Sequence, residues 1–539
     1  MSTAEKTNWK PLITIIFSMI MMYITSFGIN VLIGPIVKDL GWSVSGLQFV
    51  IVAASLVSGT LMVTSGRLGD KIGKKKIFLL GSIIYTIGLI VVVLSPTSTI
   101  FSIAWALIWP FGMVLVIPTS VALIMHFYHR AQRATAFGIY GAVLSVISAF
   151  GPLLLGVLAN EFGWRIALAL SPAFGVITII LAFGLPETSK DSSIKIDITS
   201  VLLSVGSFGM FLIATLMASN YGWLMAKRPF VLGGTEISLG GLSIVPFVYV
   251  FAILLMYLFV KRGNQLSKKG EAPLLNVSIL KNASFTIGMI VQGLLYFLIA
   301  AVIFVISVFV QAASGFDSLD TALTTLPASL GVAVFALFTP GLGQKIAPKW
   351  LIIFGFILIF LGIYFLGADT AVVMTPWTIL KGTILFGVGC GLVMGQIATI
   401  TMLRVKPEEN GEASGLSETM KEIIGQGFAI AFAGSVLFGA VYTNMAEGYA
   451  EVESIVLSDQ DKEAIIVELE DTFMEITPDE EKMWVANELP EKTKAAYNDI
   501  IVKSSEGAFS KTMWMLNVFV LISILLSFFL PGDKLSKNS

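Results

Sequence analysis

Three ionisable residues lie close together in an otherwise apolar stretch of the sequence. They are Glu418, Lys421 and Glu422, and spacings of three and four place them on neighbouring parts of one helical surface, where they can pair. A charge inside an apolar span is costly unless it is paired or hydrated, so such groups are functional candidates. The cluster predicts either a protonatable site or gate, or an interfacial cluster at a helix end.

The other residues with reactive or titratable side chains point to less chemistry. Lys381 lies in an apolar span, where it would either neutralise an anionic substrate or snorkel to the surface. His126 and His129 flank a loop and are expected to be solvated, and the single Cys390 excludes an intrachain disulfide. The sequence contains no nucleophile–base pair, metal-ligand cluster or nucleotide-binding loop, so it predicts no enzyme, no metal, no cofactor and no nucleic-acid partner.

The elements that must position these groups are membrane spans. The chain has 539 residues, of which 56% are hydrophobic and only 13% are charged, about half the charge of a soluble protein. The apolar residues fall in runs of about 20, each long enough to cross ~30 Å of hydrocarbon. We therefore predict an all-α membrane protein with fourteen spans, the last two over 414–441 and 511–530.

The positive charges indicate how the spans are oriented. Lys and Arg concentrate in the short loops on one side, whereas the short loops of the other side hold only Lys38, Arg165, Lys227 and Arg228. Short cytoplasmic loops collect positive charge. The sequence thus predicts a multi-pass plasma-membrane protein, expected to be bacterial, with both termini in the cytoplasm.

Residues 66–76, between the second and third spans, carry four lysines and an arginine against one aspartate. Glycines beside this aspartate predict a turn with close backbone packing. The pattern resembles the signature loop of the major facilitator superfamily. Residues 339–349 repeat Leu, Gly, Lys and Ile at the same offsets, as two six-helix halves related by an axis along the membrane normal would do. The residues that carry the resemblance are Gly66, Gly69, Asp70, Lys71, Gly73 and Lys74.

The resemblance also implies a conformational latch. Asp70 would face Arg130 and Arg133 across the cytoplasmic surface. Such a pair would hold the outward-open state and separate when the inner gate opens, which makes it part of a two-state element.

The fifth span contains Gly141, Gly151, Pro152 and Gly156, which resemble the Gly-Pro-rich motif of superfamily exporters. Glycines let helices approach closely and proline bends a span, so a kinked span without a transport role is the alternative. Other segments, including 411–416, are similar to the 14-span drug:proton antiporters. The resemblances extend over most of the chain.

Two positions depart from the antiporter pattern. Thr25 stands where the family usually has an aspartate, and Ala106 stands where it usually has an arginine tied to proton coupling. Both departures count against the family's standard proton route and against a preference for cationic drugs.

The predicted organisation adds an unusual acidic segment to the two halves. Residues 446–510 combine acidic residues with apolar residues at helical spacing, which predicts amphipathic helices. This segment would form either a cap that attracts cations or a solvated loop without a transport role. The expected units are a first six-helix half (1–190), two extra spans with a linker (191–282), five helices of the second half (283–445), the acidic segment (446–510), and the last helix with its tail (511–539).

The family resemblance implies secondary active export of lipophilic or drug-like compounds by alternating access. It implies proton coupling and a monomer surrounded by membrane lipids. The alternatives are a carrier for lipids, fatty acids or anionic metabolites, and a non-transporting sensor or scaffold. We expect a mostly apolar cavity lined by aromatic and soft side chains. The candidates from span depth alone are Phe27, Asn30, Trp105, Trp109, Gln292, Tyr296, Met394 and Gln396.

Overall fold

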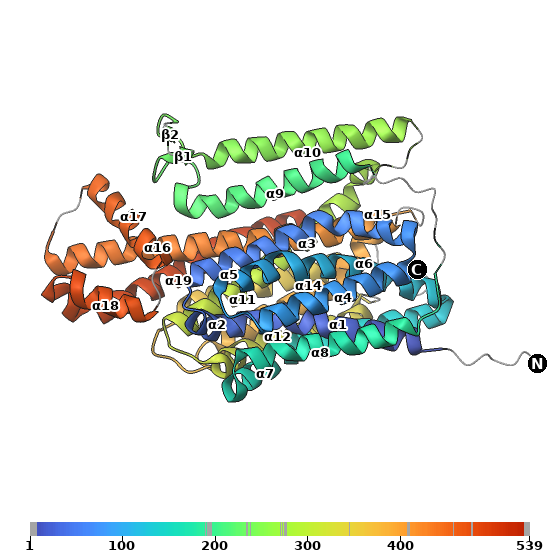
Figure 1. Ribbon diagram of the computed structural model, residues 1–539, viewed down its shortest axis with the longest axis horizontal. Helices are drawn as coiled ribbons and strands as arrows, with labels where there is room; N and C mark the ends of the chain where they lie inside the picture. The colour runs from blue at the N-terminus through green and yellow to red at the C-terminus, as the bar shows by residue number, and fades with distance from the viewer. Residues whose placement is uncertain are drawn as a thin grey trace, which may run out of the picture.

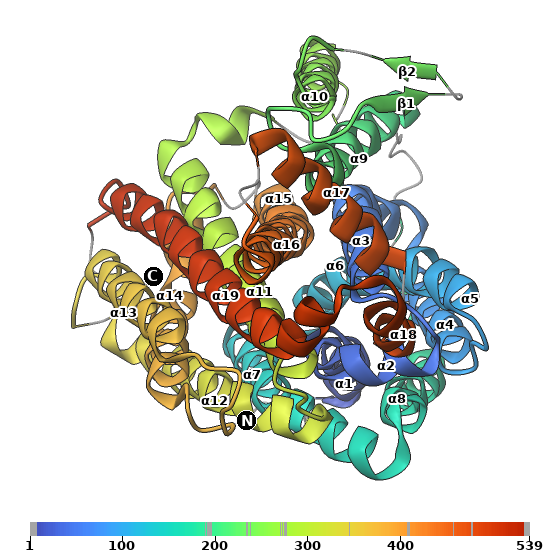
Figure 2. The same cartoon turned by 90° about the vertical axis from the view of Figure 1, so that its left-hand side faces the viewer.

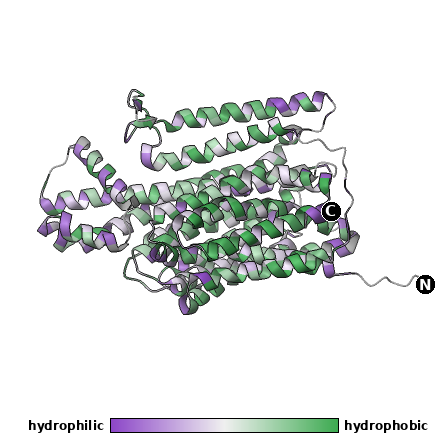
Figure 3. Ribbon diagram, viewed as in Figure 1, coloured by the Kyte–Doolittle hydropathy of each residue, from purple (hydrophilic) through white to green (hydrophobic). Residues whose placement is uncertain are grey.

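The structure is a computed structural model that describes residues 8–188, 190, 197–232, 235–237, 239–269, 271, 273, 277–343, 345–406, 410–455, 458–475 and 478–532. Fourteen helical segments in these ranges are long and apolar enough to cross a membrane. Hydrophobic residues dominate the middle of the helix bundle, and polar residues gather at its ends (Figure 3). The predicted all-α fold with fourteen spans is confirmed.

The first half forms six spans, two of which are interrupted by short segments of other helical geometry. The elements are α1 (Lys10–Gly28), η1 (Ile29–Leu32), α2 (Ile33–Asp39), α3 (Val44–Ile72), α4 (Lys74–Val93), α5 (Ser98–Ile103), η2 (Ala104–Ile108), α6 (Trp109–Phe127), α7 (Arg130–Phe162) and α8 (Trp164–Phe183).

The next two spans form an extra helical hairpin with a small antiparallel β-ribbon at its tip. Its elements are α9 (Ile198–Tyr221), β1 (Phe230–Leu232), β2 (Thr235–Ile237), α10 (Val245–Lys268) and η3 (Val277–Lys281).

The second half again contributes six spans, with two additional helices between the last two. Its elements are α11 (Ala283–Ala312), α12 (Ser318–Leu342), α13 (Pro348–Asp369), α14 (Leu380–Met402), α15 (Asn410–Met420), η5 (Lys421–Phe428), α16 (Ala429–Glu453), α17 (Asp459–Glu475), α18 (Pro478–Glu488) and α19 (Glu491–Ser527).

The two halves repeat one packing pattern. In the first half α6 packs against α3 and α4, while α8 packs against α1, α4 and α7; in the second half α14 packs against α12 and α13, while α19 packs against α11, α13 and α16. The correspondence pairs α1 with α11, α3 with α12, α7 with α16 and α8 with α19. This is the arrangement that the sequence repeat of 65–75 and 339–349 predicts, residue 344 lying outside the described ranges.

The halves meet along two lateral seams. One joins α7 to α12, and the other joins α3 to α15, η5 and α16. The extra hairpin covers only the second seam, since α9 packs against α3, η5 and α16 (Figure 2). Helix α10 packs mainly against α9 and presents apolar side chains such as Val250 and Ile253 outward, as a lipid-facing helix does.

The helices α17 and α18 project from one end of the bundle, which we call the cap end (Figure 1). The end at which α3 turns into α4 is called the loop end. The thirteenth and fourteenth spans are longer than predicted, because their helices reach Glu453 and begin at Glu491. The acidic segment is therefore not a solvated loop in the described residues: Leu469 of α17 packs on Tyr442 and Met445 of α16.

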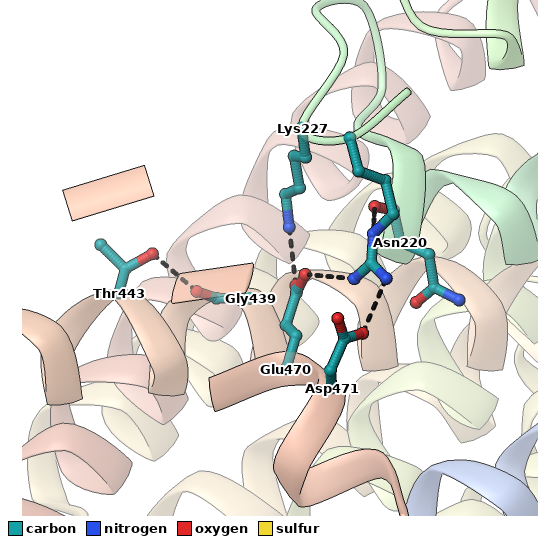
Figure 4. A network of polar contacts seen from close by, with 7 residues as sticks. Asn220, Lys227, Gly439, Thr443, Glu470 and Asp471 are labelled. Atoms are coloured by element: carbon teal, nitrogen blue, oxygen red, sulfur yellow. Dashed lines mark hydrogen bonds and ion pairs between the residues drawn. The ribbon is translucent and has the colours of Figure 1, made fainter. Parts of the chain in front are cut away.

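A buried charge cluster ties the cap to the hairpin (Figure 4). Glu470 on α17 is 2% exposed and accepts a hydrogen bond of 2.7 Å from Lys227, while Arg228 lies 3.7 Å from its second oxygen. Arg228 also bonds Asp471 at 2.6 Å and donates to the backbone oxygen of Asn220 at the end of α9. The cap is thus attached both to α16 and to the extra hairpin.

Candidate functional site

The predicted charge cluster lies at the seam between the halves. Lys421 Nζ pairs with Glu418 Oε1 one turn earlier on the same helix. Ser58 Oγ, on α3 of the first half, donates a hydrogen bond of 3.1 Å to Glu422 Oε2. Because α3 and η5 belong to different halves, this bond joins the cluster across the seam.

Aromatic side chains surround these charges. Lys421 Nζ lies 5.1 Å from the centre of the Tyr296 ring, which comes from α11, and a cation over a ring face is attracted by its quadrupole. Tyr23 of α1 and Tyr140 of α7 lie within electrostatic range of Glu418. Helices of both halves therefore converge on the cluster, as expected for a central site.

The local helix geometry explains how the charges reach this position. Residues 421–428 form a π-helical segment, and such segments often occur at functional sites because the extra residue per turn reorients side chains. A Cβ at Gly425 would lie 2.5 Å from Cβ of Tyr296, and one at Gly59 would lie 2.4 Å from Ile423. Glycine at both positions lets α11 and α3 approach this segment closely.

The arrangement of charges is suited to moving a proton. Two carboxyl groups and one ammonium leave one excess negative charge when all are ionised, and a single proton would neutralise it. The side chains of Lys421 and Glu418 are only 19% and 34% exposed, so each depends on the other for compensation. Among the described residues no group of three His, Cys, Asp or Glu is placed to hold a metal ion.

The signature segment is more helical than predicted. Helix α3 continues to Ile72, so the turn consists of Gly73, whose φ of +112° is a conformation that favours glycine. Asp70 pairs with Lys74 at 3.6 Å and is about half exposed. A Cβ at Gly69 would lie 3.2 Å from Thr119 of α6, whereas one at Gly66 would meet no other side chain or helix within 4 Å. Lys71 lies in the last turn of α3.

The predicted contact between Asp70 and Arg133 is absent from this structure. Arg133 instead donates hydrogen bonds to the backbone oxygens of Tyr128 at 3.0 Å and Met125 at 2.9 Å. These carbonyls lie at the end of α6, where helical partners are missing and a basic side chain is favourable. The side chain of Arg130 lies outside the described residues.

The residues of the exporter-type motif differ in how closely they pack against other helices. A Cβ at Gly156 would lie 2.7 Å from the backbone oxygen of Ser318, so this glycine sets the close contact between α7 and α12. A Cβ at Gly151 would lie 3.6 Å from Ile147 and 3.7 Å from Ile24, while one at Gly141 would meet no other side chain or helix within 4 Å. Pro152 lies within α7, which continues without interruption from Arg130 to Phe162.

Three of the predicted cavity residues and Lys381 lie away from the charge cluster. Trp105 and Trp109 are 1% and 6% exposed and pack edge to face inside the first half, so they are core residues. Gln396 is fully buried and donates to the backbone oxygen of Thr339 within the second half. Lys381, at the start of α14, is 54% exposed and pairs with Asp369 at 3.1 Å, which places it at the cap end, away from the cluster.

The remaining cavity candidates are partly or fully buried in α1, η1, α11 and α14. Tyr296 contacts Lys421, Phe27 stacks on Tyr23 at 5.7 Å, and the side-chain oxygen of Asn30 has no hydrogen-bond partner. Gln292 is 5% exposed, and Met394 is partly buried.

Sequence reasoning missed Ser58, Tyr23 and Tyr140. A serine or a tyrosine in an apolar span is common, so the sequence carries no signal that separates these three from other polar residues. Thr25, at the departure from the antiporter pattern, is fully buried, and Ala106 lies in the π-helical segment η2.

Solved structures share the fold. A bacterial homologue of the human lysosomal transporter Spinster, in an inward-facing and unoccupied conformation, matches with a TM-score of 0.56 and 13% identity over 99% of this chain and 100% of that chain. The human organic anion transporter MFSD10 matches with a TM-score of 0.52 and 11% identity over 96% of this chain and 98% of that chain.

Curated relatives are similar in sequence over most of their length. The chain is 24% identical to the probable actinorhodin transporter of Streptomyces coelicolor, over 97% of this chain and 92% of that protein. It is 24% identical to the multidrug resistance protein Stp of Mycobacterium tuberculosis, over 80% and 76% of the two chains. The model of the Major Facilitator Superfamily matches residues 15–430. With the repeated six-helix packing, this match shows that the chain belongs to the Major Facilitator Superfamily.

Proposed function

We propose that this protein is a secondary active transporter that exports lipophilic, drug-like compounds across the plasma membrane by alternating access. The similarity to the actinorhodin transporter and to Stp supports this class of substrate. The cap end would face outward and both termini would lie in the cytoplasm, which the positive charge of the loop end supports. The protein would act as a monomer among membrane lipids and would not be an enzyme.

The observation that carries the proposal is the charged cluster of Glu418, Lys421 and Glu422 at the seam. Its hydrogen bond to Ser58 and its contact with Tyr296 couple a titratable group to both halves. Proton coupling through this cluster would replace the family's usual groups, whose positions hold Thr25 and Ala106. A proton gained or lost here would change the charge that the seam must accommodate, which biases one state of the transporter over the other.

The latch of Asp70 with Arg130 and Arg133 belongs to the same proposal. In the described residues Asp70 pairs with Lys74 at the start of α4, and Arg133 donates to backbone oxygens at the end of α6, as expected for the state in which the latch is separated. The pair would form when the loop end closes.

Efflux of a lipophilic fluorescent dye from expressing cells tests export. Asp70→Asn should cripple efflux while protein levels hold, whereas Glu236→Gln, on the exposed strand β2, should behave as the parent protein. A protonophore should abolish concentrative efflux, and Glu418→Gln should lower it. Efflux that ignores both would contradict proton coupling while leaving export intact.

One observation favours a second function. The cap is folded, docked on α16 and bound to the hairpin by Glu470, which a sensor or scaffold would need for an outer partner. Removing residues 458–488 would abolish such a function, while Asp70→Asn would leave it unchanged. A carrier of anionic metabolites is not favoured, since Lys381 lies on the surface and is paired with Asp369.

A further inference from the structure

The first span is broken near the cap end, and the break leaves backbone groups without helical partners. The 3-10 turn η1 separates α1 from α2, so α2 begins anew at Ile33. The first N–H groups of a helix have no partner in that helix, and Gly34 is the second residue of α2. In a hydrocarbon environment an unpaired backbone group is costly, so it needs a partner from elsewhere.

Gln311, at the far end of α11 in the other half, supplies that partner. The N–H of Gly34 donates to Gln311 Oε1 at 2.7 Å, and Gln311 Nε2 donates to the backbone oxygen of Asn30 at 2.8 Å. One amide thus satisfies both a donor and an acceptor of the broken span. A third bond of 3.0 Å, to the backbone oxygen of Ser307, holds the amide in place on its own helix.

A second glutamine also bonds the backbone of the opposite half, at the hairpin-covered seam. Gln48, one turn from the cap-end start of α3, is 7% exposed, and its Nε2 donates to the backbone oxygen of Ile430 at 2.9 Å. The amide fits against Gly434, where a Cβ would lie 1.9 Å from Nε2. Both glutamines therefore bond the backbone of the opposite half, and both do so near the cap end.

The contact between α7 and α12 is also closer near the cap end than near the loop end. Near the cap end a Cβ at Gly156 would lie 2.7 Å from the backbone oxygen of Ser318, whereas a Cβ at Gly138, near the loop end, would meet no other side chain or helix within 4 Å. The halves are thus held together at the cap end by two neutral amides and by close backbone packing.

We propose that Gln311 and Gln48 form an amide latch that keeps the cap end closed, and that both bonds must break when this end opens. Neutral amides suit this position because they bond backbone groups without burying a charge, so the latch is insensitive to pH. The inference rests on alternating access but concerns only the equilibrium between the two states, which is measured without substrate or gradient.

The test measures the separation of the halves at the cap end by double electron–electron resonance. Spin labels are placed at Lys38→Cys and Val373→Cys, both exposed, after Cys390→Ser. Interhelical hydrogen bonds in membranes contribute modestly, so Gln311→Ala, which removes two, should raise the ratio of open to closed molecules roughly five- to tenfold. Gln48→Ala should raise it roughly twofold to threefold.

Asn444→Ala is the matched control. Its amide also donates to a backbone oxygen on another helix, that of Ser504 at 3.1 Å, but α16 and α19 belong to the same half. This variant should leave the distances unchanged. Equal shifts in the control, or no shift in either glutamine variant while the purified protein remains monodisperse, would overturn the latch.

A second measurement uses the tight fit of Gln48. Gly434→Ala should widen the cap end in the parent protein and have no further effect in the Gln48→Ala background, because the clashing amide is gone. An additive effect of the two changes would place Gly434 outside the latch. If the parent protein does not export the dye while the spin-label distances change as predicted, the result counts against the proposed function and not against the latch.

Discussion

The two lateral seams occupy equivalent positions in the repeat, yet they are built differently. The α7–α12 seam is closed by small residues, with Gly156 against the backbone of Ser318. The α3–α16 seam contains Gln48, Ser58 and the cluster around Lys421, and α9 covers it from the membrane side. Polar groups are thus placed where a helix shields them from lipid, and the uncovered seam relies on packing.

The hairpin that covers the polar seam is fastened at both ends. Near the loop end Arg262 of α10 donates two hydrogen bonds of 3.0 Å to Asp197, which also caps the start of α9. At the cap end Lys227 and Arg228 bind Glu470. The two extra spans are therefore an integral wall of one seam rather than loosely attached helices.

The largest effect is expected at the uncovered seam. Gly156→Leu would force a side chain into the backbone of α12, and overpacking of this kind costs about 3 kcal/mol. We expect loss of the monodisperse size-exclusion peak and of efflux. Gly138→Leu should keep both, because a Cβ at this position of the same helix would meet no other side chain or helix within 4 Å. Equal tolerance of the two changes would show that this seam does not depend on close packing.

At the covered seam, Lys421→Met should lower efflux at least about tenfold, because Glu418 would then be a partly buried charge without its partner. Lys421→Arg should retain part of the activity. Lys381→Met removes only an exposed pair and should change efflux by less than about twofold. Initial efflux rates at matched protein levels make the comparison, and similar losses in both methionine variants would contradict a central role of the cluster.

Weakening the bonds between the cap and the hairpin at the cap end should have a moderate effect on stability. Arg228→Ala should cost about 1–2 kcal/mol, less than a fully broken buried pair because Lys227 remains. Limited proteolysis of the cap and thermal unfolding at pH 7 would measure it. Lys494→Ala, on an exposed pair with Glu491, is the control and should change neither. A cap that resists proteolysis equally in both variants would rule out the fastening.

The same fastening should depend on pH. Burial raises the pKa of Glu470 above its ordinary value, although Lys227 and Arg228 lower it in part. A raised carboxyl pKa favours the folded state at acid pH, and this contribution is lost as pH rises through the folded-state pKa. Relative to Glu470→Gln, the parent protein should therefore lose thermal stability as pH rises above the ordinary carboxyl pKa of 4.5. A constant difference between the two melting temperatures would contradict this.

The smallest effect is expected at the loop-end fastening. Hydrogen bonds from Arg262 lower the pKa of Asp197 to about 2, so the stability it contributes is present above its ordinary value near 3.8 and is lost as pH falls towards 2. Arg262→Gln should abolish this loss. Thermal unfolding between pH 2 and 5 would test it, and an unchanged acid dependence in the variant would assign the loss to other carboxyl groups.

The sequence predicted the fold well because its signals are local. Apolar runs long enough to cross a membrane can be counted, and the repeat of 65–75 in 339–349 reports the two halves directly. The spacing of Glu418, Lys421 and Glu422 also placed these groups on one surface. The ends of spans were less predictable, because α3 continues to Ile72 and α16 to Glu453 through polar residues that carry no apolar signal.

Sequence alone determined that this chain is a fourteen-span helical protein with an internal repeat, because hydrocarbon forces every backbone group in a span to be satisfied within a helix. Only the tertiary structure decided which polar groups meet. The partners of Gln311, Glu422 and Glu470 lie hundreds of residues away, and the contacts exist because helices of two halves and a cap are packed together. The structure also showed that Trp105 and Gln396 are buried within a single half and do not line the seam. Sequence could not show this, because the depth of a residue along a span does not say which side of the helix faces the seam.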